Sequence, residues 1–143
     1  MHRLFPRLAF EGYRITSPQT WNYNCIAWAA GDDQRWWWPD PGLVAYWPDG
    51  LPLEASLSAF VQMFERLGYA CTDSREHEIG FDKVAIFVLD GAVTHAARQL
   101  PSGKWSSKLG PNHDIEHTIT GLDGHRYGAV AQVMKRPMTA MSQ

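Results

Sequence analysis

The sequence predicts an α+β domain in which an N-terminal helix carrying Cys25 packs on a central antiparallel β-sheet. Three observations predict this fold: a short apolar run follows two asparagines, a second segment has helical periodicity, and the later apolar runs are separated by turn residues. Hydrophobic residues make up 45% of the 143 residues and charged residues 20%, which suits one compact unit. We therefore expect a single domain over residues 1–143.

The composition argues against several classes of function. The formal net charge is -2 and the 13 Lys and Arg residues are scattered, so nucleic acid is not an expected partner. No stretch reaches the roughly 18 apolar residues of a membrane span, and no apolar run near the N-terminus is long enough for a signal peptide. We expect a cytoplasmic protein, or one exported without a signal peptide, and no membrane partner. The sequence does not indicate the oligomeric state.

The first helix is predicted over residues 23–30. The side chain of Asn22 or Asn24 can accept a hydrogen bond from the first turn, and the following run Ile-Ala-Trp-Ala-Ala is apolar and rich in helix formers. Gly31 is a typical residue for the end of a helix. The 20 residues before the helix form a lead-in with one edge strand.

An ordered, aromatic loop is predicted over residues 34–52. Its proline and glycine residues prevent regular structure, and its aromatic residues need contacts. Trp36, Trp37 and Trp38 are consecutive, and three adjacent tryptophans cannot all face one core from a regular element. We expect some of them to form a cleft wall or a contact surface.

The second helix has the clearest periodicity. Ser56 is its expected N-cap and Gly68 its expected end, and apolar residues recur between them at helical spacing. These residues are Leu57, Phe60, Val61, Phe64 and Leu67. A short strand at residues 69–71 follows. This helix is expected to pack against the core and to carry no chemistry.

The second half of the chain is predicted to form a sheet. Strands are expected at residues 83–89, 93–100 and 104–109, and the Asp90-Gly91 and Pro-Ser-Gly turns between them are short, which predicts an antiparallel meander. A short helix at about residues 114–120 and a last strand at residues 127–134 complete the prediction.

Cys25 and His95 are the candidate catalytic residues. A cysteine at the start of a helix lies at the positive end of the helix dipole, which favours the nucleophilic thiolate. A cysteine nucleophile needs a base, and His95 lies near the start of a central strand between small residues. The alternatives are a small buried cysteine that fills a contact between helix and sheet, and a structural histidine on a strand.

Three stretches together resemble a bacterial family of uncharacterised proteins near the papain-like and NlpC-type thiol hydrolases. These stretches are Tyr-Asn-Cys-Ile-Ala-Trp-Ala around Cys25, Thr-His-Ala-Ala-Arg-Gln around His95, and Trp-Ser-Ser-Lys-Leu-Gly from Trp105. The resemblance implies a papain-like fold with the cysteine on a helix and the histidine on a following strand. It also implies an oxyanion-hole glutamine six residues before the cysteine, a spacing that Gln19 has; Asn22 or Asn24 could replace it.

The residue that orients His95 is left open by the sequence. Ser106 and Ser107 lie on the strand where the resemblance places the orienting residue, in place of the usual asparagine. Asp114 is the preferred orienting residue, because a carboxylate fixes the imidazole tautomer and stabilises imidazolium. The alternative is that Asp114 caps the short helix that follows it.

A metal site is not expected. His113 and His117 are four residues apart, but no third ligand and no H-E-x-x-H pattern accompany them. No cofactor is expected. The sequence therefore predicts a cysteine peptidase, amidase or deamidase that acts on a peptide or another amide through an acyl-enzyme intermediate. The alternative is a catalytically inactive binding module on the same fold, with the tryptophans of residues 36–47 as its contact surface.

Overall fold

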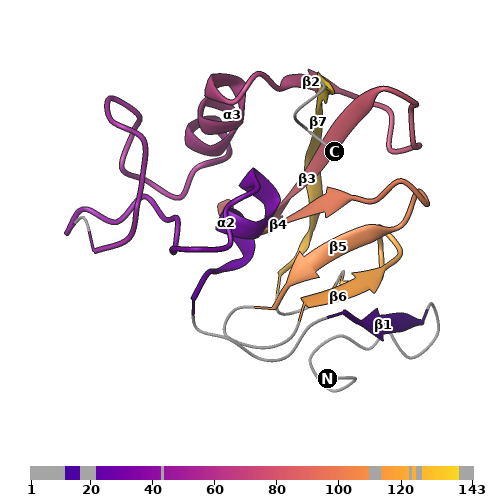
Figure 1. Ribbon diagram of the computed structural model, residues 1–143. Coiled ribbons are helices and arrows are strands. Elements are labelled where there is room, and N and C mark those ends of the chain that lie inside the picture. The colour runs from indigo at the N-terminus through magenta and orange to yellow at the C-terminus, as the bar shows by residue number, and fades with distance from the viewer. Residues whose placement is uncertain are drawn as a thin grey trace.

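A seven-stranded antiparallel sheet dominates the computed structural model, which describes residues 12–16, 22–42, 44–109, 114–122, 124 and 127–138 (Figure 1). The order of the strands across the sheet is β1-β6-β5-β4-β3-β7-β2. The strands are β1 (Tyr13–Ile15), β2 (Ala70–Thr72), β3 (Phe81–Leu89), β4 (Ala92–Gln99), β5 (Trp105–Lys108), β6 (Asp114–His117) and β7 (Ala129–Pro137). The long strands β4, β3 and β7 are neighbours in this order, and the predicted meander, β3, β4 and β5, forms the centre of the sheet.

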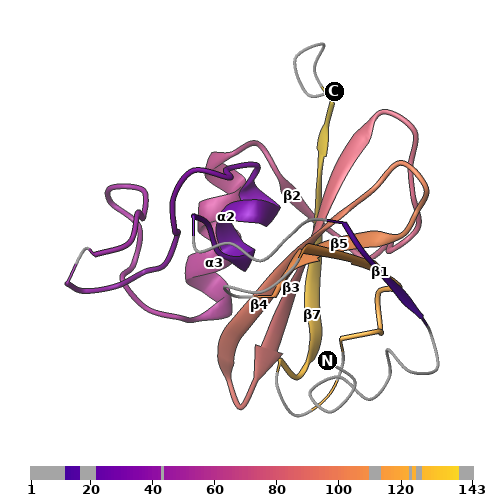
Figure 2. The ribbon, with the colours of Figure 1, turned by 60° about the horizontal axis from the view of Figure 1, so that its bottom comes forward.

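Both helices of the described residues lie on one face of the sheet (Figure 2). The helix α2 (Cys25–Ala30) is capped by the Asn24 side chain, which accepts a hydrogen bond from the Ala27 backbone N–H, and it ends at Gly31 in the left-handed conformation. The helix α3 (Leu57–Arg66) begins after the Ser56 cap. The predicted caps Asn24 and Ser56 are confirmed.

The predicted papain-like α+β fold class is wrong. The two helices, of six and ten residues, are short beside a sheet of seven strands, so the fold is largely β. The error arose because apolar helical runs near the N-terminus were given the weight of a helical layer. The chain between the two helices contains the predicted aromatic loop and adds no further helix, and β1, β2 and β6 extend the sheet to seven strands.

The helix predicted over residues 114–120 is also a correction, because residues 114–117 form the strand β6. This segment pairs with β5 on one side and with β1 on the other, so its backbone groups are satisfied by two ladders. Alternate residues Ile115, His117 and Ile119 are the more apolar ones, a period of two that indicates a strand. Asp114 therefore caps no helix.

Two hydrophobic cores lie on opposite sides of the sheet. The first core lies under the helices and contains Ile26, Phe60, Phe64, Val84 and Ile86. The second core contains Phe87, Trp105, Ile115, Leu122 and Val133. Neighbouring residues of β3 alternate between them, as the pleat of a strand requires. The position of a residue in its strand therefore decides on which face of the sheet its side chain lies.

Two glycines with similar backbone angles test how tightly the sheet is packed. Gly91 (φ 81°) follows Asp90 (φ 52°) in the two-residue turn between β3 and β4, and an added Cβ there would meet nothing within 4 Å. Gly128 (φ 78°) precedes β7, and its added Cβ would lie 2.0 Å from the Val88 carbonyl oxygen. Both positions favour glycine, but only Gly128 also lacks space.

We predict that Gly91→Ala lowers the free energy of unfolding by about 1 kcal/mol, the strain of the left-handed conformation alone. Gly128→Ala should lower it by about 3 kcal/mol or more, because the backbone of β3 must also move. Urea denaturation of both variants measures the difference. Equal losses would contradict the close approach of Gly128 to Val88.

Candidate functional site

Cys25 is the first residue of α2 and its side chain points at the sheet. The residue is 8% exposed and belongs to the first core. The backbone N–H of Ala96, in the middle of β4, hydrogen-bonds the sulfur. The helix start therefore places the thiol against β4 at Ala96, the residue that follows His95 in the sequence.

Burial controls the charge of the Cys25 thiol. Removal from water raises its pKa to about 11, and the opposing influences are smaller: the backbone N–H groups of Ala96, Ile26 and Cys25 itself, and the positive charge of Lys108. The thiol is therefore neutral at pH 7 in this structure, although it lies at a helix start.

His95 is fully buried on the second-core side of β4. Its ring stacks on Tyr127 with 4.1 Å between the ring centroids, and it contacts the Phe87 ring edge-on at 5.2 Å. Phe87 lies directly opposite His95 in the ladder between β3 and β4. These aromatic contacts fix the plane of the imidazole.

A buried chain of hydrogen bonds runs from His95 across the sheet. His95 Nε2 lies 2.9 Å from the Ser107 hydroxyl oxygen, which lies 2.7 Å from His117 Nε2. His117 Nδ1 lies 2.6 Å from the Thr118 carbonyl oxygen. Adjacent strands thus contribute one group each: β4 gives His95, β5 gives Ser107 and β6 gives His117.

This chain assigns the His95 tautomer. The Thr118 carbonyl can only accept, so His117 Nδ1 carries a hydrogen, and a neutral His117 accepts at Nε2 from the Ser107 hydroxyl. Ser107 has no second hydrogen, so His95 Nε2 donates to it. The remaining lone pair of His95 is at Nδ1, which is buried without a hydrogen-bond partner in the structure described.

The His95 imidazole is neutral at pH 7. Burial lowers its pKa well below the usual 6.5, and a positive charge on the nearby His117 would lower it further. Protonation at Nδ1 would place a positive charge where no acceptor lies, which explains the direction of the shift. A neutral imidazole with an unpaired lone pair is the form that a general base takes before it accepts a proton.

No hydrogen bond joins Cys25 to His95 in this structure. Cys25 belongs to the first core, whereas the His95 ring contacts Phe87 of the second. The ladder between β4 and β5 consists of two residue pairs, at Arg98 and Gln99, and does not continue along β4 to Ala96 and His95. At Ala96 and His95, β4 is paired with β3 but not with β5. The two side chains approach this stretch from opposite faces of the sheet.

Asp114, the preferred orienting residue of the prediction, lies elsewhere. Its carboxylate accepts a hydrogen bond of 2.5 Å from the Tyr23 hydroxyl, and it faces Lys108 across the ladder between β5 and β6. These neighbours lie on the helix side of the sheet, because Asp114 and Ile115 point to opposite faces. The alternative orienting residue, Ser107, is the one that contacts the imidazole.

The predicted oxyanion residues are only partly placed. Gln19 lies outside the described residues, and Asn22 is exposed just before α2. The Asn24 amide is already engaged: Oδ1 accepts from the backbone N–H groups of Ala27 and Trp37, and Nδ2 donates to the Trp37 carbonyl oxygen at 2.8 Å. Asn24 thus has a structural role.

The three consecutive tryptophans point in different directions, as predicted. Trp37 is buried and packs edge-on against Tyr46, while Trp38 packs against Phe60 of α3. Trp36 is 37% exposed and lines a surface pocket with Tyr46. The aromatic loop is therefore partly core and partly surface, and the wall that Trp36 forms belongs to this surface pocket.

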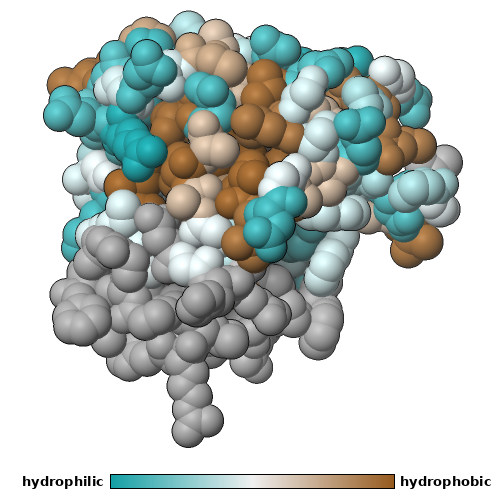
Figure 3. All heavy atoms as spheres, turned by 180° about the vertical axis from the view of Figure 1, so that it is seen from behind, coloured by the Kyte–Doolittle hydropathy of each residue, from teal (hydrophilic) through white to brown (hydrophobic). Residues whose placement is uncertain are grey.

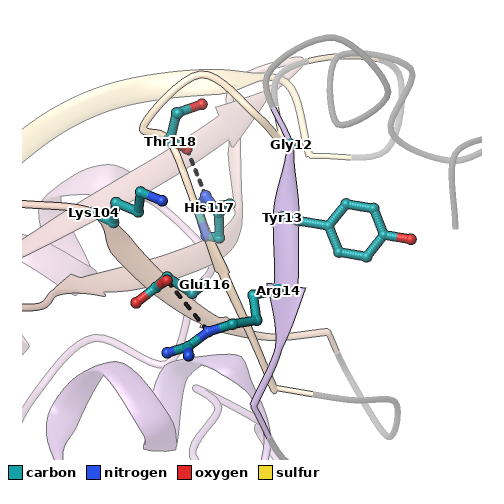
Figure 4. A pocket seen from close by; sticks show the side chains of 7 residues that line it. All are labelled: Gly12, Tyr13, Arg14, Lys104, Glu116, His117 and Thr118. Atoms are coloured by element: carbon teal, nitrogen blue, oxygen red, sulfur yellow. Dashed lines mark hydrogen bonds and ion pairs between the residues drawn. The ribbon is translucent and has the colours of Figure 1, made fainter.

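The hydrogen-bond chain ends beside a hollow of about 300 Å³ (Figure 4). His117 and Thr118 line it together with Arg14 of β1, and the Arg14 guanidinium lies 3.5 Å from the Glu116 carboxylate. His113, the other half of the considered metal pair, lies outside the described residues. Among those described, no group of three or more metal-binding side chains occurs.

His117 and Tyr127 are the parts of this site that the sequence analysis missed. Once residues 114–117 were taken for a helix, His117 could not be placed on the same face as Ser107. The alternation of Ile115, His117 and Ile119 was the available signal. Tyr127 had no comparable signal, because its contact with His95 joins residues that are distant in the chain.

These features define a largely β domain in which a buried thiol and a buried imidazole chain meet at one central strand. The chain belongs to the family described as "Domain of unknown function (DUF7689)", whose model matches residues 14–135. No curated protein and no solved structure matches the chain. No helix in the described part of the chain is long and apolar enough to cross a membrane.

We predict that the protein loses stability as the pH falls below about 6.5, the ordinary pKa of an unfolded histidine. The pKa of His95 is lower in the folded state than in the unfolded chain, so below pH 6.5 the unfolded chain binds more protons than the folded protein. The free energy of unfolding therefore falls as the pH is lowered through this range. The loss from one group is at most about 1.4 kcal/mol per pH unit.

Urea unfolding between pH 5 and 8 measures this slope in the wild type and in His95→Gln. The variant should show a smaller slope over the same range because it lacks the group that titrates. An unchanged slope in the variant would assign the pH dependence to other residues.

Proposed function

We propose that the protein is a thiol hydrolase that cleaves an amide or ester bond, with Cys25 as nucleophile and His95 as general base. One observation carries the proposal: the His95 lone pair is held at Nδ1, without a partner, next to the residue whose N–H contacts the Cys25 sulfur. A nucleophile, a base and a group that orients the base are the parts that covalent catalysis requires.

Ser107 takes the orienting role in this proposal. It holds the imidazole through Nε2, so that Nδ1 faces away from Ser107 as the proton acceptor. His117 and the Thr118 carbonyl fix the direction of the Ser107 hydroxyl in turn. A hydroxyl stabilises the imidazolium less than a carboxylate would, which is consistent with a base that is neutral at rest.

The reaction proceeds in two stages. His95 Nδ1 takes the proton of the Cys25 thiol, and the sulfur attacks the substrate carbonyl carbon. The C–N bond of the amide breaks, the nitrogen leaves with the proton from His95, and the acyl group remains on Cys25 as a thioester. Water, deprotonated by His95, then attacks the thioester, the acid leaves, and Cys25 recovers its proton. The oxyanion is met by the Cys25 backbone N–H, with Gln19 or Asn22 as the second donor.

In the resting state of this proposal, Cys25 and His95 are both uncharged and both buried. A thiol with a pKa of about 11 and an imidazole with a lowered pKa do not exchange a proton while both are buried. Substrate binding must bring Sγ within hydrogen-bond reach of Nδ1, and catalytic hydrogen bonds often shorten only in such complexes. At Ala96 and His95, where this approach takes place, β4 has no ladder pair with β5 and keeps its ladder with β3.

A binding module without catalysis is the second candidate. The raised pKa of the Cys25 thiol favours it, because a buried neutral thiol is the ordinary state of a structural cysteine. The pocket in the aromatic loop would then be the functional surface. The two candidates differ in one measurable property, the reactivity of Cys25.

We predict that iodoacetamide labels Cys25 at pH 7–8, far below the pKa set by burial, and that His95→Gln slows this labelling by about 100-fold or more. The physical reason is that His95 supplies the base that burial otherwise denies to the thiol. Peptide mass spectrometry of the full chain between pH 5 and 11 gives the rate at each cysteine.

Cys71 is the internal control, because it is exposed and free. Its labelling should be the same in the wild type and in His95→Gln, which controls for the reagent and the pH. The far-UV circular dichroism of both proteins, which should be the same, reports that the variant is folded. If Cys25 reacts only as the pH approaches 11, and at the same rate without His95, the hydrolase proposal fails and the binding module is favoured.

A further inference from the structure

We propose that the aromatic loop binds a cationic protein segment that carries an apolar side chain. This inference concerns the pocket in the loop and does not depend on whether Cys25 is catalytic. The pocket has a volume of about 730 Å³, and its walls include Trp36, Val44, Tyr46 and Trp47. Arg35 and Asp49 complete its rim. This size suits one or two side chains of a peptide or a comparable ligand.

The walls of the pocket are fixed before any partner binds. The Tyr46 backbone N–H donates to the Trp36 carbonyl oxygen at 2.8 Å, and the Trp38 N–H donates to the Tyr46 carbonyl oxygen at 3.0 Å. The Trp47 indole N–H donates to the Pro52 carbonyl oxygen, and the Trp47 ring packs against Phe60. A pocket that is already ordered loses little conformational entropy on binding.

Apolar surface remains exposed at this ordered pocket. Trp36 is 37% exposed and Val44 is 90% exposed. The loop projects away from the sheet on the helix side (Figure 1), and in the view from behind, hydrophobic and hydrophilic residues lie side by side at the edge where it projects (Figure 3). Exposed apolar surface on an ordered element, with polar residues around it, is typical of an interaction site.

Charge identifies the class of partner. Residues 31–54, which include the loop, contain five carboxylates and one cation, a net charge of -4, although the whole chain carries -2. The remainder of the chain therefore carries +2. The carboxylates are Asp32, Asp33, Asp40, Asp49 and Glu54, and the cation is Arg35. Of these residues, Asp49 and Arg35 line the pocket, and the other carboxylates lie in the same stretch of the sequence.

The local cations offset only part of this charge. Arg35 pairs with Asp32 at 2.9 Å and lies flat over the Tyr46 ring, 3.6 Å from its centroid. Arg66 of α3 donates to the Asp49 backbone carbonyl oxygen and makes no ion pair with its carboxylate among the contacts described. Asp33, Asp40 and Asp49 form no ion pair within 4 Å among the described residues, although the charge of Asp33 also acts on Arg98.

A lysine or arginine next to an apolar residue fits this arrangement. The apolar side chain enters the pocket between the aromatic rings, and the cation meets the unpaired carboxylates or the face of Trp36. A nucleic acid or an anionic membrane surface is repelled by the same carboxylates. The observations therefore favour a basic protein segment over both.

The test measures the binding of fluorescein-labelled peptide pools to the full chain by fluorescence anisotropy. One pool combines leucine or phenylalanine with lysine and arginine, a second keeps the apolar residues and replaces the cations by glutamate, and a third keeps the cations and replaces the apolar residues by serine. We expect the first pool to bind at least tenfold more tightly than the other two, and its affinity to fall as salt is added.

Variants locate the binding. Trp36→Ala and Val44→Ser should each weaken binding of the first pool by about tenfold, and Val44→Ser keeps the test valid if Trp36→Ala fails to fold, because Val44 is almost fully exposed. Asp33→Asn with Asp49→Asn should weaken it and reduce the effect of salt. Ile79→Ala and Asp73→Asn are matched controls, since both residues are exposed and neither lines the pocket; both should bind as the wild type does.

Several results would overturn the inference. These are equal binding of the cationic and acidic pools, no binding of any pool, or wild-type binding by both Trp36→Ala and Val44→Ser. Concentration-dependent dimerisation that Val44→Ser abolishes would assign the surface to a second copy of the chain, and binding to vesicles of anionic lipid would assign it to membranes. Cys25→Ser should bind the first pool as the wild type does, so failure of the thiol proposal leaves this result unaffected.

Discussion

The side chain of Asn24 is the contact on which both candidate functional regions depend. Its Oδ1 accepts from the Ala27 N–H, which fixes the start of α2 and therefore the position of Cys25. The same amide makes two hydrogen bonds to the Trp37 backbone, which anchor the aromatic loop at its first buried residue. One amide thus sets where the thiol meets β4 and where the loop leaves the helix. An aspartate would keep the cap but lose the donor to Trp37, so the two tasks together favour asparagine.

Sequence reasoning recovered the elements whose signals are local. The start of α2, the Ser56 cap of α3 and the Asp90-Gly91 turn depend on neighbouring residues, and each lies where it was predicted. The strands β3, β4 and β5 followed from apolar runs between short turns. These segments needed no information about distant parts of the chain.

Other features could not be predicted, because they depend on contacts between distant residues. The pairings of β1 with β6 and of β2 with β7 join residues far apart in the chain, and β6 itself was mistaken for a helix. Asp114 was preferred to Ser107 for the chemistry of its carboxylate, without knowledge of the face of the sheet on which each side chain lies. In a strand, Asp114 points to the helix side and His117 to the His95 side, so the register of one four-residue segment decides which groups can orient the imidazole.

The position of Cys25 shows why a residue type and a helix start do not suffice to predict reactivity. The helix start and three backbone N–H groups favour the thiolate, as the sequence suggested. Burial against β4 outweighs all of them, because the loss of hydration of a charged sulfur is larger than the gain from partial charges on a few amides. The depth of a side chain is a tertiary property, and the printed sequence contains no direct signal for it.

The chain of His95, Ser107 and His117 is an unusual choice for the interior of a sheet. Apolar side chains of similar size would fill the same space beside Phe87 and Tyr127 without polar groups that need partners. Hydrogen bonds satisfy most of this chain, but the His95 Nδ1 acceptor has no partner, and a buried unsatisfied acceptor typically costs about 1–3 kcal/mol. Structural need alone does not explain why this hydrogen-bond chain ends in an unpaired lone pair on His95. The next residue, Ala96, contacts Cys25, which is the buried one of the two cysteines. A general base needs such an unpaired acceptor. For this reason we favour the thiol proposal over a purely structural role for His95.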